Sequence, residues 1–142
     1  MLHLVSERCL EDQIQIDSAG TASYHTGNKA DSRTAATARK RGFDLPSRAR
    51  QFTEGDFDRF DYVLAMDDSN LRDLKSLSGG HHDDKIYLLL DFDPDIPKGS
   101  SVPDPYYGGD RGFEHVLDLC TSACGSLLEY LVEEHALEAK AL

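Results

Sequence analysis

One short loop of this sequence combines residues that could do chemistry. Two prolines, Pro103 and Pro105, flank Asp104, and Tyr106 and Tyr107 follow directly. Each proline fixes its own φ angle and restricts the residue before it, so the carboxyl group of Asp104 is held in one direction. Neighbouring aromatic rings would partly desolvate that carboxyl group and raise its pKa, which suits a general acid. The same residues also suit an ordinary turn, so the loop alone leaves both interpretations open.

Other polar groups have simpler interpretations. Residues 81–84 (HHDD) follow two glycines in one loop and lack the spacing of metal ligands on a helix, so we predict no metal site there. Arg48 and Arg50 could bind a phosphate group, or they could be solvated surface side chains, which is the usual state of an arginine.

The composition limits the kinds of partner. The chain has 142 residues, enough for one domain with a hydrophobic core, and a net charge of −11. This charge would be repelled by nucleic acid and by anionic membranes, and no apolar run reaches membrane-spanning length. The three cysteines form no disulfide-scaffold pattern, which predicts a reducing, cytoplasmic location.

The elements that must position the Asp104 loop alternate between strands and helices. Residues 13–18 alternate apolar and polar side chains, whereas residues 62–65 and 86–90 are apolar runs typical of strands buried on both faces. We predict helices at residues 1–10, 31–41, 54–60 and 111–135, and one through residue 77 that is capped by residue 68 or 69. Leu71, Leu74 and Leu77 of that last helix should face the core. This alternation predicts an α/β domain with a parallel sheet.

The order of six motifs resembles the low-molecular-weight protein tyrosine phosphatases. The motifs are residues 16–21 (IDSAGT), 24–27 (YHTG), 47–51 (SRARQ), 60–67 (FDYVLAMD), 69–74 (SNLRDL) and 102–109 (VPDPYYGG). The resemblance implies a three-layer α/β/α fold whose parallel sheet has four strands in the order 2-1-3-4. It also implies hydrolysis of phosphotyrosine proteins or small aryl phosphates through a phosphocysteine intermediate, without a metal or a cofactor.

The resemblance also implies roles for particular residues. Asp104 aligns with the general acid of the family. Tyr24 aligns with an aromatic residue that lines the substrate cleft, and Tyr106 and Tyr107 align with the tyrosine pair beside the acid.

One part of the family pattern is missing from these residues. The family's nucleophile lies after the first strand, in a loop of the form Cys, five residues, Arg, then Ser or Thr. The residues six positions after Cys9, Cys120 and Cys124 are Gln15, Ser126 and Tyr130. We therefore predict that the three cysteines are small core residues and that residues 1–142 form a single domain that is incomplete at its N-terminus. Without the first strand, its two neighbours would stand about twice the strand spacing of ~4.8 Å apart, so the chain should be poorly stable or rearranged as written. Without the nucleophile it should be inactive.

Two other functions remain open at this point. The chain could be a non-catalytic binding or regulatory fragment that keeps an aromatic cleft. It could also have the chemistry of arsenate reductases or protein-arginine phosphatases, which share the architecture, although paired tyrosines favour the flat ring of an aryl phosphate. The oligomeric state does not follow from the sequence.

Overall fold

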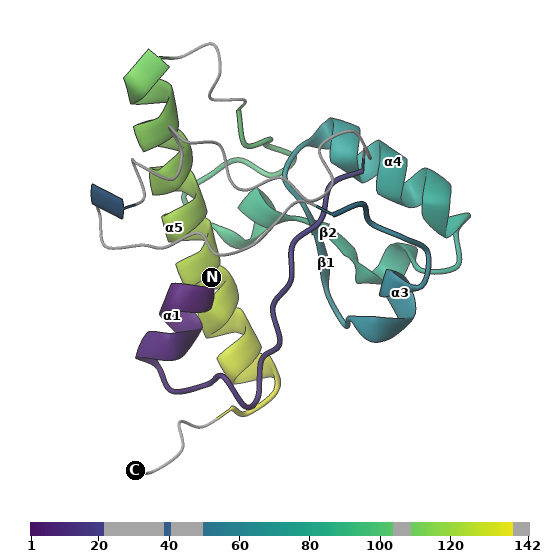
Figure 1. The fold of residues 1–142 in the computed structure, drawn as a ribbon, viewed down its shortest axis with the longest axis horizontal. Coiled ribbons are helices and arrows are strands. Elements are labelled where there is room, and N and C mark those ends of the chain that lie inside the picture. The colour runs from purple at the N-terminus through teal and green to yellow at the C-terminus, as the bar shows by residue number, and fades with distance from the viewer. Residues whose placement is uncertain (22–38, 41–49, 104–108, 138–142) are drawn as a thin grey trace.

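The computed structural model describes residues 1–21, 39–40, 50–103 and 109–137 (Figure 1). In chain order the elements are α1 (Leu2–Glu7), α3 (Asp56–Arg59), β1 (Val63–Ala65), α4 (Asp68–Ser78), a 3-10 helix (Asp83–Lys85), β2 (Ile86–Leu88), a second 3-10 helix (Leu89–Phe92) and α5 (Gly109–Glu134). The predicted α/β class is confirmed by this order. None of the helices in the described ranges has the length and apolar character needed to cross a bilayer.

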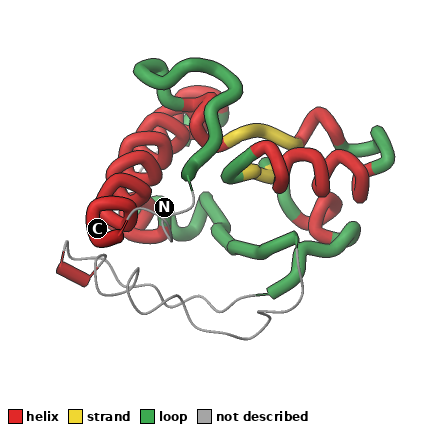
Figure 2. The backbone as a smooth tube through the Cα atoms, turned by 90° about the horizontal axis from the view of Figure 1, so that it is seen from above, coloured by secondary structure: helices red, strands yellow, loops and turns green. Residues whose placement is uncertain are grey.

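The two strands form a parallel pair that is covered on both faces. Val63 aligns with Ile86, and Ala65 aligns with Leu88. Val63 and Ala65 pack with Leu74 of α4, whereas Leu64 contacts the core cluster built on α5. Successive side chains of a strand point to opposite faces, so α4 and α5 cover opposite faces of the sheet, as Figures 1 and 2 show. The predicted layered arrangement is therefore confirmed.

The predicted strand at residues 13–18 is wrong. Ile14 and Ile16 are half-buried and alternate with exposed neighbours such as Gln15, which is the side-chain pattern of a strand. However, the sheet of the described chain contains only β1 and β2, and the nearest bridge joins Gly20 to Gln51. A strand needs the backbone groups of a partner, and an alternating pattern does not supply them.

The first helix is shorter than predicted, and Cys9 is not a core residue. α1 ends at Glu7, and Cys9 follows with a positive φ of 54° in an exposed turn. The core contacts of this region come instead from Val5 and Leu10, each 2% exposed, which pack against Leu128 of α5. The predicted helix over residues 1–10 would include Cys9, but α1 stops two residues before it.

The predictions for α4 are right in place and wrong in detail. The residue that caps its first turn is Asp67, whose Oδ1 accepts the N–H of Asn70 at 2.7 Å. Gly79 ends the helix with a left-handed φ of 59°, which glycine adopts without a Cβ clash. Leu74 is 4% exposed, but Leu77 is 41% exposed and so does not face the core as predicted.

The remaining predicted elements differ mainly in their ends. The strand predicted at residues 86–90 stops at Leu88, and the chain then turns into the 3-10 helix that packs on α5. The long last helix is confirmed over Gly109–Glu134. Most of the predicted 31–41 helix lies outside the described residues, although Arg39 and Lys40 are helical.

Candidate active site

The loop that leads to Asp104 is anchored at the end of β1. The backbone N–H of Val102 donates to the carbonyl oxygen of Met66 at 2.7 Å. The hydroxyl oxygen of Ser101 accepts the backbone N–H of Asp68, the first residue of α4, at 3.1 Å. The chain therefore reaches Pro103 from the carboxyl end of a parallel strand, where open α/β sheets place their ligands.

Two aspartates hold the earlier part of the same loop. Oδ1 of Asp91 accepts the N–H of Gly99 at 2.8 Å. Asp93 is buried, and its carboxylate accepts the hydroxyl of Ser122 in α5 at 2.6 Å and the N–H of Asp95 at 3.0 Å. These two bonds, the first being the stronger influence, lower the pKa of Asp93 below its usual value. The loop is thus tied to α5 by an ionised carboxylate.

A second anchor lies at the base of the segment that contains Tyr24. The N–H of Gly20 donates to the carbonyl oxygen of Arg50, and the N–H of Phe52 donates to that of Gly20, both at 2.8 Å. The chain before residue 22 is therefore fixed to the chain after residue 49.

The side chain of Arg50 strengthens this anchor by pairing with two carboxylates. Its Nη1 and Nη2 donate to Asp56 at 2.9 and 3.2 Å, and its Nε donates to Asp17 at 3.1 Å. Asp56 is 1% exposed and also accepts the N–H of Thr53 at 2.9 Å. The bonds from Arg50, followed by those from Thr53, hold the pKa of Asp56 below its usual value, and Asp56 in turn raises the pKa of Arg50.

This ion-pair network could not be read from the sequence. Arg50 is neither free for a phosphate group nor simply solvated, because its guanidinium group is engaged by Asp17 and Asp56. One local signal was available: Thr53 and Asp56 have the spacing of a capping box, in which the acidic side chain accepts the N–H of the first residue. No local pattern points to Asp17, which lies 33 residues from Arg50.

The residues predicted to act on substrate lie outside the described ranges. They are Asp104, Tyr24, Tyr106 and Tyr107, and Arg48 lies outside them as well. The structure thus describes the anchor at Val102, before Asp104, and the anchor at Gly20, before Tyr24. The roles of the four residues remain predictions.

None of the three cysteines lies in an environment that would activate a nucleophile. Cys120 and Cys124 are half-buried on α5, where they contact its apolar core cluster. Burial raises the pKa of the Cys120 thiol to about 11, whereas an attacking cysteine needs a lowered pKa. Cys9 lies in the exposed turn after α1. Cys120 and Cys124 are therefore packing residues, as predicted.

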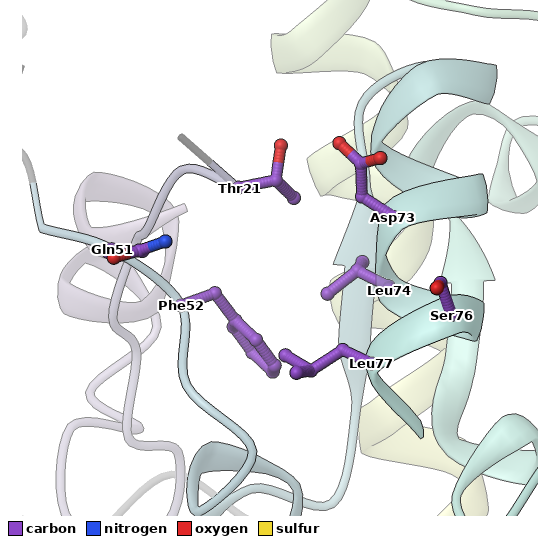
Figure 3. A pocket seen from close by; sticks show the side chains of 7 residues that line it. All are labelled: Thr21, Gln51, Phe52, Asp73, Leu74, Ser76 and Leu77. Atoms are coloured by element: carbon purple, nitrogen blue, oxygen red, sulfur yellow. The ribbon is translucent and has the colours of Figure 1, made fainter. Parts of the chain in front are cut away.

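A pocket lies between α4 and the Gly20–Gln51 bridge, as Figure 3 shows. Its volume is about 360 Å³, and it is lined by Thr21, Gln51, Phe52, Asp73, Leu74, Ser76 and Leu77. Among the described residues, the lining contains no cysteine and no basic side chain. Its helical side comes from the second half of α4, whereas Ser101 binds at the first residue of that helix. This pocket is therefore distinct from the anchored end of the Asp104 loop.

The HHDD run has a structural role in the described chain. The ring of His82 stacks on the fully buried ring of Phe57, with centroids 4.9 Å apart, and the backbone N–H of His82 donates to Ser78 Oγ at 2.8 Å. Over the ranges the structure describes, no group of three or more His, Cys, Asp or Glu side chains is placed to hold a metal ion.

Comparison with known proteins gives a consistent family assignment. The family model for low molecular weight phosphotyrosine protein phosphatase matches residues 1–137. A putative low-molecular-weight protein-tyrosine-phosphatase of Synechocystis is 43% identical over 131 residues, which is 92% of this chain and 83% of that protein.

Solved structures agree with this match. A protein tyrosine phosphatase from Entamoeba histolytica superposes with a TM-score of 0.86 at 38% identity, covering 95% of this chain and 85% of that one. A Drosophila arginine phosphatase superposes with a TM-score of 0.81 at 29% identity, covering 91% and 83%. Because the family model matches residues 1–137 of this chain and both structures have the same fold, the chain belongs to the low-molecular-weight protein tyrosine phosphatase family.

Proposed function

We propose that this chain is the acid-loop and substrate-recognition part of a phosphatase that hydrolyses phosphotyrosine proteins or small aryl phosphates. The observation that carries the proposal is the double attachment of Ser101 and Val102 to the end of β1 and the start of α4. This attachment supports a general-acid role for Asp104, since it fixes the chain two residues before that carboxyl group. The role of Asp104 is to protonate the leaving phenol oxygen, which contributes on the order of 10²–10⁴ in rate.

The nucleophile of this reaction is not supplied by residues 1–142. None of the three cysteines has an arginine six residues later, and two of them pack in the core of α5. A phosphate dianion also needs converging N–H donors and a bidentate guanidinium group, and Arg50 is already paired with two carboxylates. We propose that a first strand and a Cys-x5-Arg-Ser/Thr loop, encoded upstream of Met1, complete the enzyme, and that the chain as written does not turn over.

The remaining roles follow from the resemblance of these motifs to those of the family. Tyr24 would line one wall of the cleft, and Tyr106 and Tyr107 would contact the aromatic ring of the substrate beside Asp104. The anchors at Gly20 and Val102 support this arrangement, because each fixes the chain within four residues of a proposed cleft residue.

Two forms of the chain and one substitution test the proposal. The chain as written and a form extended through the upstream codons are assayed with p-nitrophenyl phosphate and with phenyl phosphate at mildly acidic pH. We expect turnover from the extended form alone. In that form Asp104→Asn should lower kcat far more for phenyl phosphate, whose leaving group is poor, than for p-nitrophenyl phosphate. Turnover by the chain as written, or upstream codons without the Cys-x5-Arg motif, would contradict the proposal.

The missing motif also favours a second candidate, a non-catalytic phosphotyrosine-binding fragment. Calorimetry of the chain as written with a phosphotyrosine peptide separates this candidate from the first. Saturable binding without hydrolysis by either form would favour the binding fragment. Phosphoarginine, the substrate class suggested by the Drosophila relative's name, serves as a competing substrate in the same assay.

A further inference from the structure

We propose that the pocket between α4 and the Gly20–Gln51 bridge binds a small organic cation, in which an ammonium group is joined to an apolar stem. This goes beyond the proposed function, because none of the described lining residues has a role in phosphate hydrolysis. Three features carry the proposal: a carboxylate at one end of the pocket, apolar side chains at the other end, and a volume that suits a small molecule.

The first feature is the carboxylate of Asp73, whose charge is not balanced within the described chain. No hydrogen bond or ion pair joins this side chain to another described residue. The side chains three and four positions away on α4, where a helix places its ion-pair partners, are all uncharged: Ser69, Asn70, Ser76 and Leu77. The polar lining from the bridge consists of Thr21 and Gln51, which are neutral. An ammonium group would supply the missing charge and donate to this carboxylate.

The second feature is the apolar character of the opposite end. Figure 3 shows the side chains of Thr21 and Asp73 at one end of the pocket and those of Phe52 and Leu77 at the other. Phe52 is partly buried against the cluster beneath α4, and Leu77 is 41% exposed. A ring placed against these two side chains would remove apolar surface from water and pair with the aromatic ring of Phe52. The pocket therefore matches a ligand with a cationic head and an apolar stem.

The third feature is the size and place of the pocket. Its volume of about 360 Å³ is near the lower end of the range of small-molecule pockets, roughly 300–1,000 Å³. A single ring on a short chain suits this volume. The described lining includes neither residues 15–19 nor Val63–Ala65, between which the first strand is expected. The pocket is therefore not the gap that this strand would fill.

A nuclear magnetic resonance titration of the chain as written tests the proposal. The probes are 4-phenylbutylamine, which is an ammonium ion at neutral pH, and 4-phenylbutan-1-ol, an uncharged molecule with the same stem. In about 0.15 M salt the Debye length is about 8 Å, so distant charges contribute little. We expect the amine to shift the amide signals of Gln51, Asp73 and Leu77 saturably. Its affinity should be about two- to fivefold higher than that of the alcohol, as for one exposed ion pair.

Two substitutions in the lining separate the head of the ligand from its stem. Asp73→Asn removes the charge and keeps the size of the side chain, so the amine should then bind only as well as the alcohol. The affinity of the alcohol should not change. Leu77→Ser removes apolar surface from the other end and should weaken both probes by the same factor. Both side chains are exposed, so both variants should fold.

Glu133→Gln on α5 is the matched control for total charge. It removes one negative charge, as Asp73→Asn does, from an exposed position on the helix that covers the opposite face of the sheet. Equal weakening of the amine by these two variants would mean that the net charge of −11 attracts any cation, and it would overturn the proposal. Equal affinities of the two probes for the parent chain, or no saturable shifts at the pocket, would overturn it as well.

The form extended through the upstream codons gives the last test. The amine should bind this form with the same affinity, because the described lining lies within residues 21–77. Loss of binding would mean that upstream residues fill the pocket, and the proposal would then be wrong. The titration does not measure hydrolysis, so a failure of the proposed function would leave its result unaffected.

Discussion

At the scale of single residues, Asp56 does more than its position in a four-residue helix suggests. Its buried carboxylate accepts hydrogen bonds from Arg50 and Thr53, and Arg50 carries the connection on to Asp17. The Arg50 guanidinium group, held by Asp56, therefore joins two chain segments that are far apart in sequence. The carboxylate and its donors satisfy one another in this buried place. Removing either partner leaves the other without its hydrogen bonds, which lowers the stability of the fold.

The substitution Asp56→Asn tests this role. We expect it to lower the free energy of unfolding by about 2–3 kcal/mol, because it breaks a charge-assisted pair and leaves Arg50 with one carboxylate. Urea denaturation monitored by circular dichroism measures the change. Asp58→Asn is the matched control, since Asp58 is exposed on the same helix and should change stability by a few tenths of a kcal/mol. Equal effects of the two variants would contradict the importance of the buried pair.

The same variant should change the acid sensitivity of the fold. The folded-state pKa of Asp56 lies below its usual value of 3.8, so its stabilising contribution is complete above that pH. The contribution is lost as the pH falls through the lower folded-state pKa. Stability of the parent chain should therefore decrease below about pH 4, and Asp56→Asn should show a shallower decrease.

Tyr62 gives a prediction at the alkaline end. Its hydroxyl lies 2.8 Å from Nε2 of His135, and burial is the main cause that raises its pKa to about 12. The neutral phenol is favoured by folding, so its contribution to stability is complete below the usual pKa of 10.0 and is lost as the pH rises through about 12. Ultraviolet titration of tyrosinate should show a step near pH 12 that Tyr62→Phe removes. A titration that keeps this step in the variant would contradict the assignment.

At the scale of elements, the ends of helices are decided by side-chain bonds that periodicity does not reveal. Hydrophobic spacing located α4, but the choice among Asp67, Asp68 and Ser69 as its cap depends on which oxygen meets the free N–H of the first turn. The structure selects Asp67, whose bond to Asn70 is 2.7 Å long. Asp68 instead donates its own N–H to Ser101, which ties the helix to the Asp104 loop.

Substitutions at these two aspartates should therefore differ. Asp67→Ala is expected to lower the free energy of unfolding by ~1 kcal/mol, the usual cost of a lost helix cap. Asp68→Ala should cost less, because its side chain is exposed and only its backbone binds Ser101. Thermal unfolding of the two variants under identical conditions makes the comparison. A larger effect at Asp68 would reassign the cap.

The strands show which part of a fold a sequence can predict. The apolar runs at residues 62–65 and 86–90 predicted β1 and β2, although the second run extends two residues past the end of β2. A strand buried on both faces is apolar along its whole length. The alternation at residues 13–18 predicted a strand that the structure lacks, since pairing depends on a neighbour elsewhere in the chain. The Arg50–Asp17 contact was missed for the same reason, because it joins residues that share no local pattern.

At the scale of the whole molecule, the two sides of the sheet are coupled through β1. Val63 and Ala65 belong to the cluster beneath α4, and Leu64 contacts the cluster of α5. If β1 separates from one cluster, the side chains of the other cluster that pack on its opposite face are exposed as well. Residues 1–142 should therefore unfold as one cooperative domain, although the contacts of α4 and α5 lie on opposite sides.

Two large-to-small substitutions test this coupling. Leu74→Ala on α4 and Leu127→Ala on α5 remove side chains that are 4% and 3% exposed, and each should cost about 2–5 kcal/mol. If β1 couples the two sides, each variant will raise the hydrogen exchange of both helices by the same factor, and denaturation will remain a single transition. Lys75→Ala and Glu133→Ala, at exposed positions of the same helices, are the controls and should leave both exchange rates unchanged. Faster exchange confined to the substituted helix would mean that the two layers open separately, because a three-residue strand would then be too short to transmit the loss.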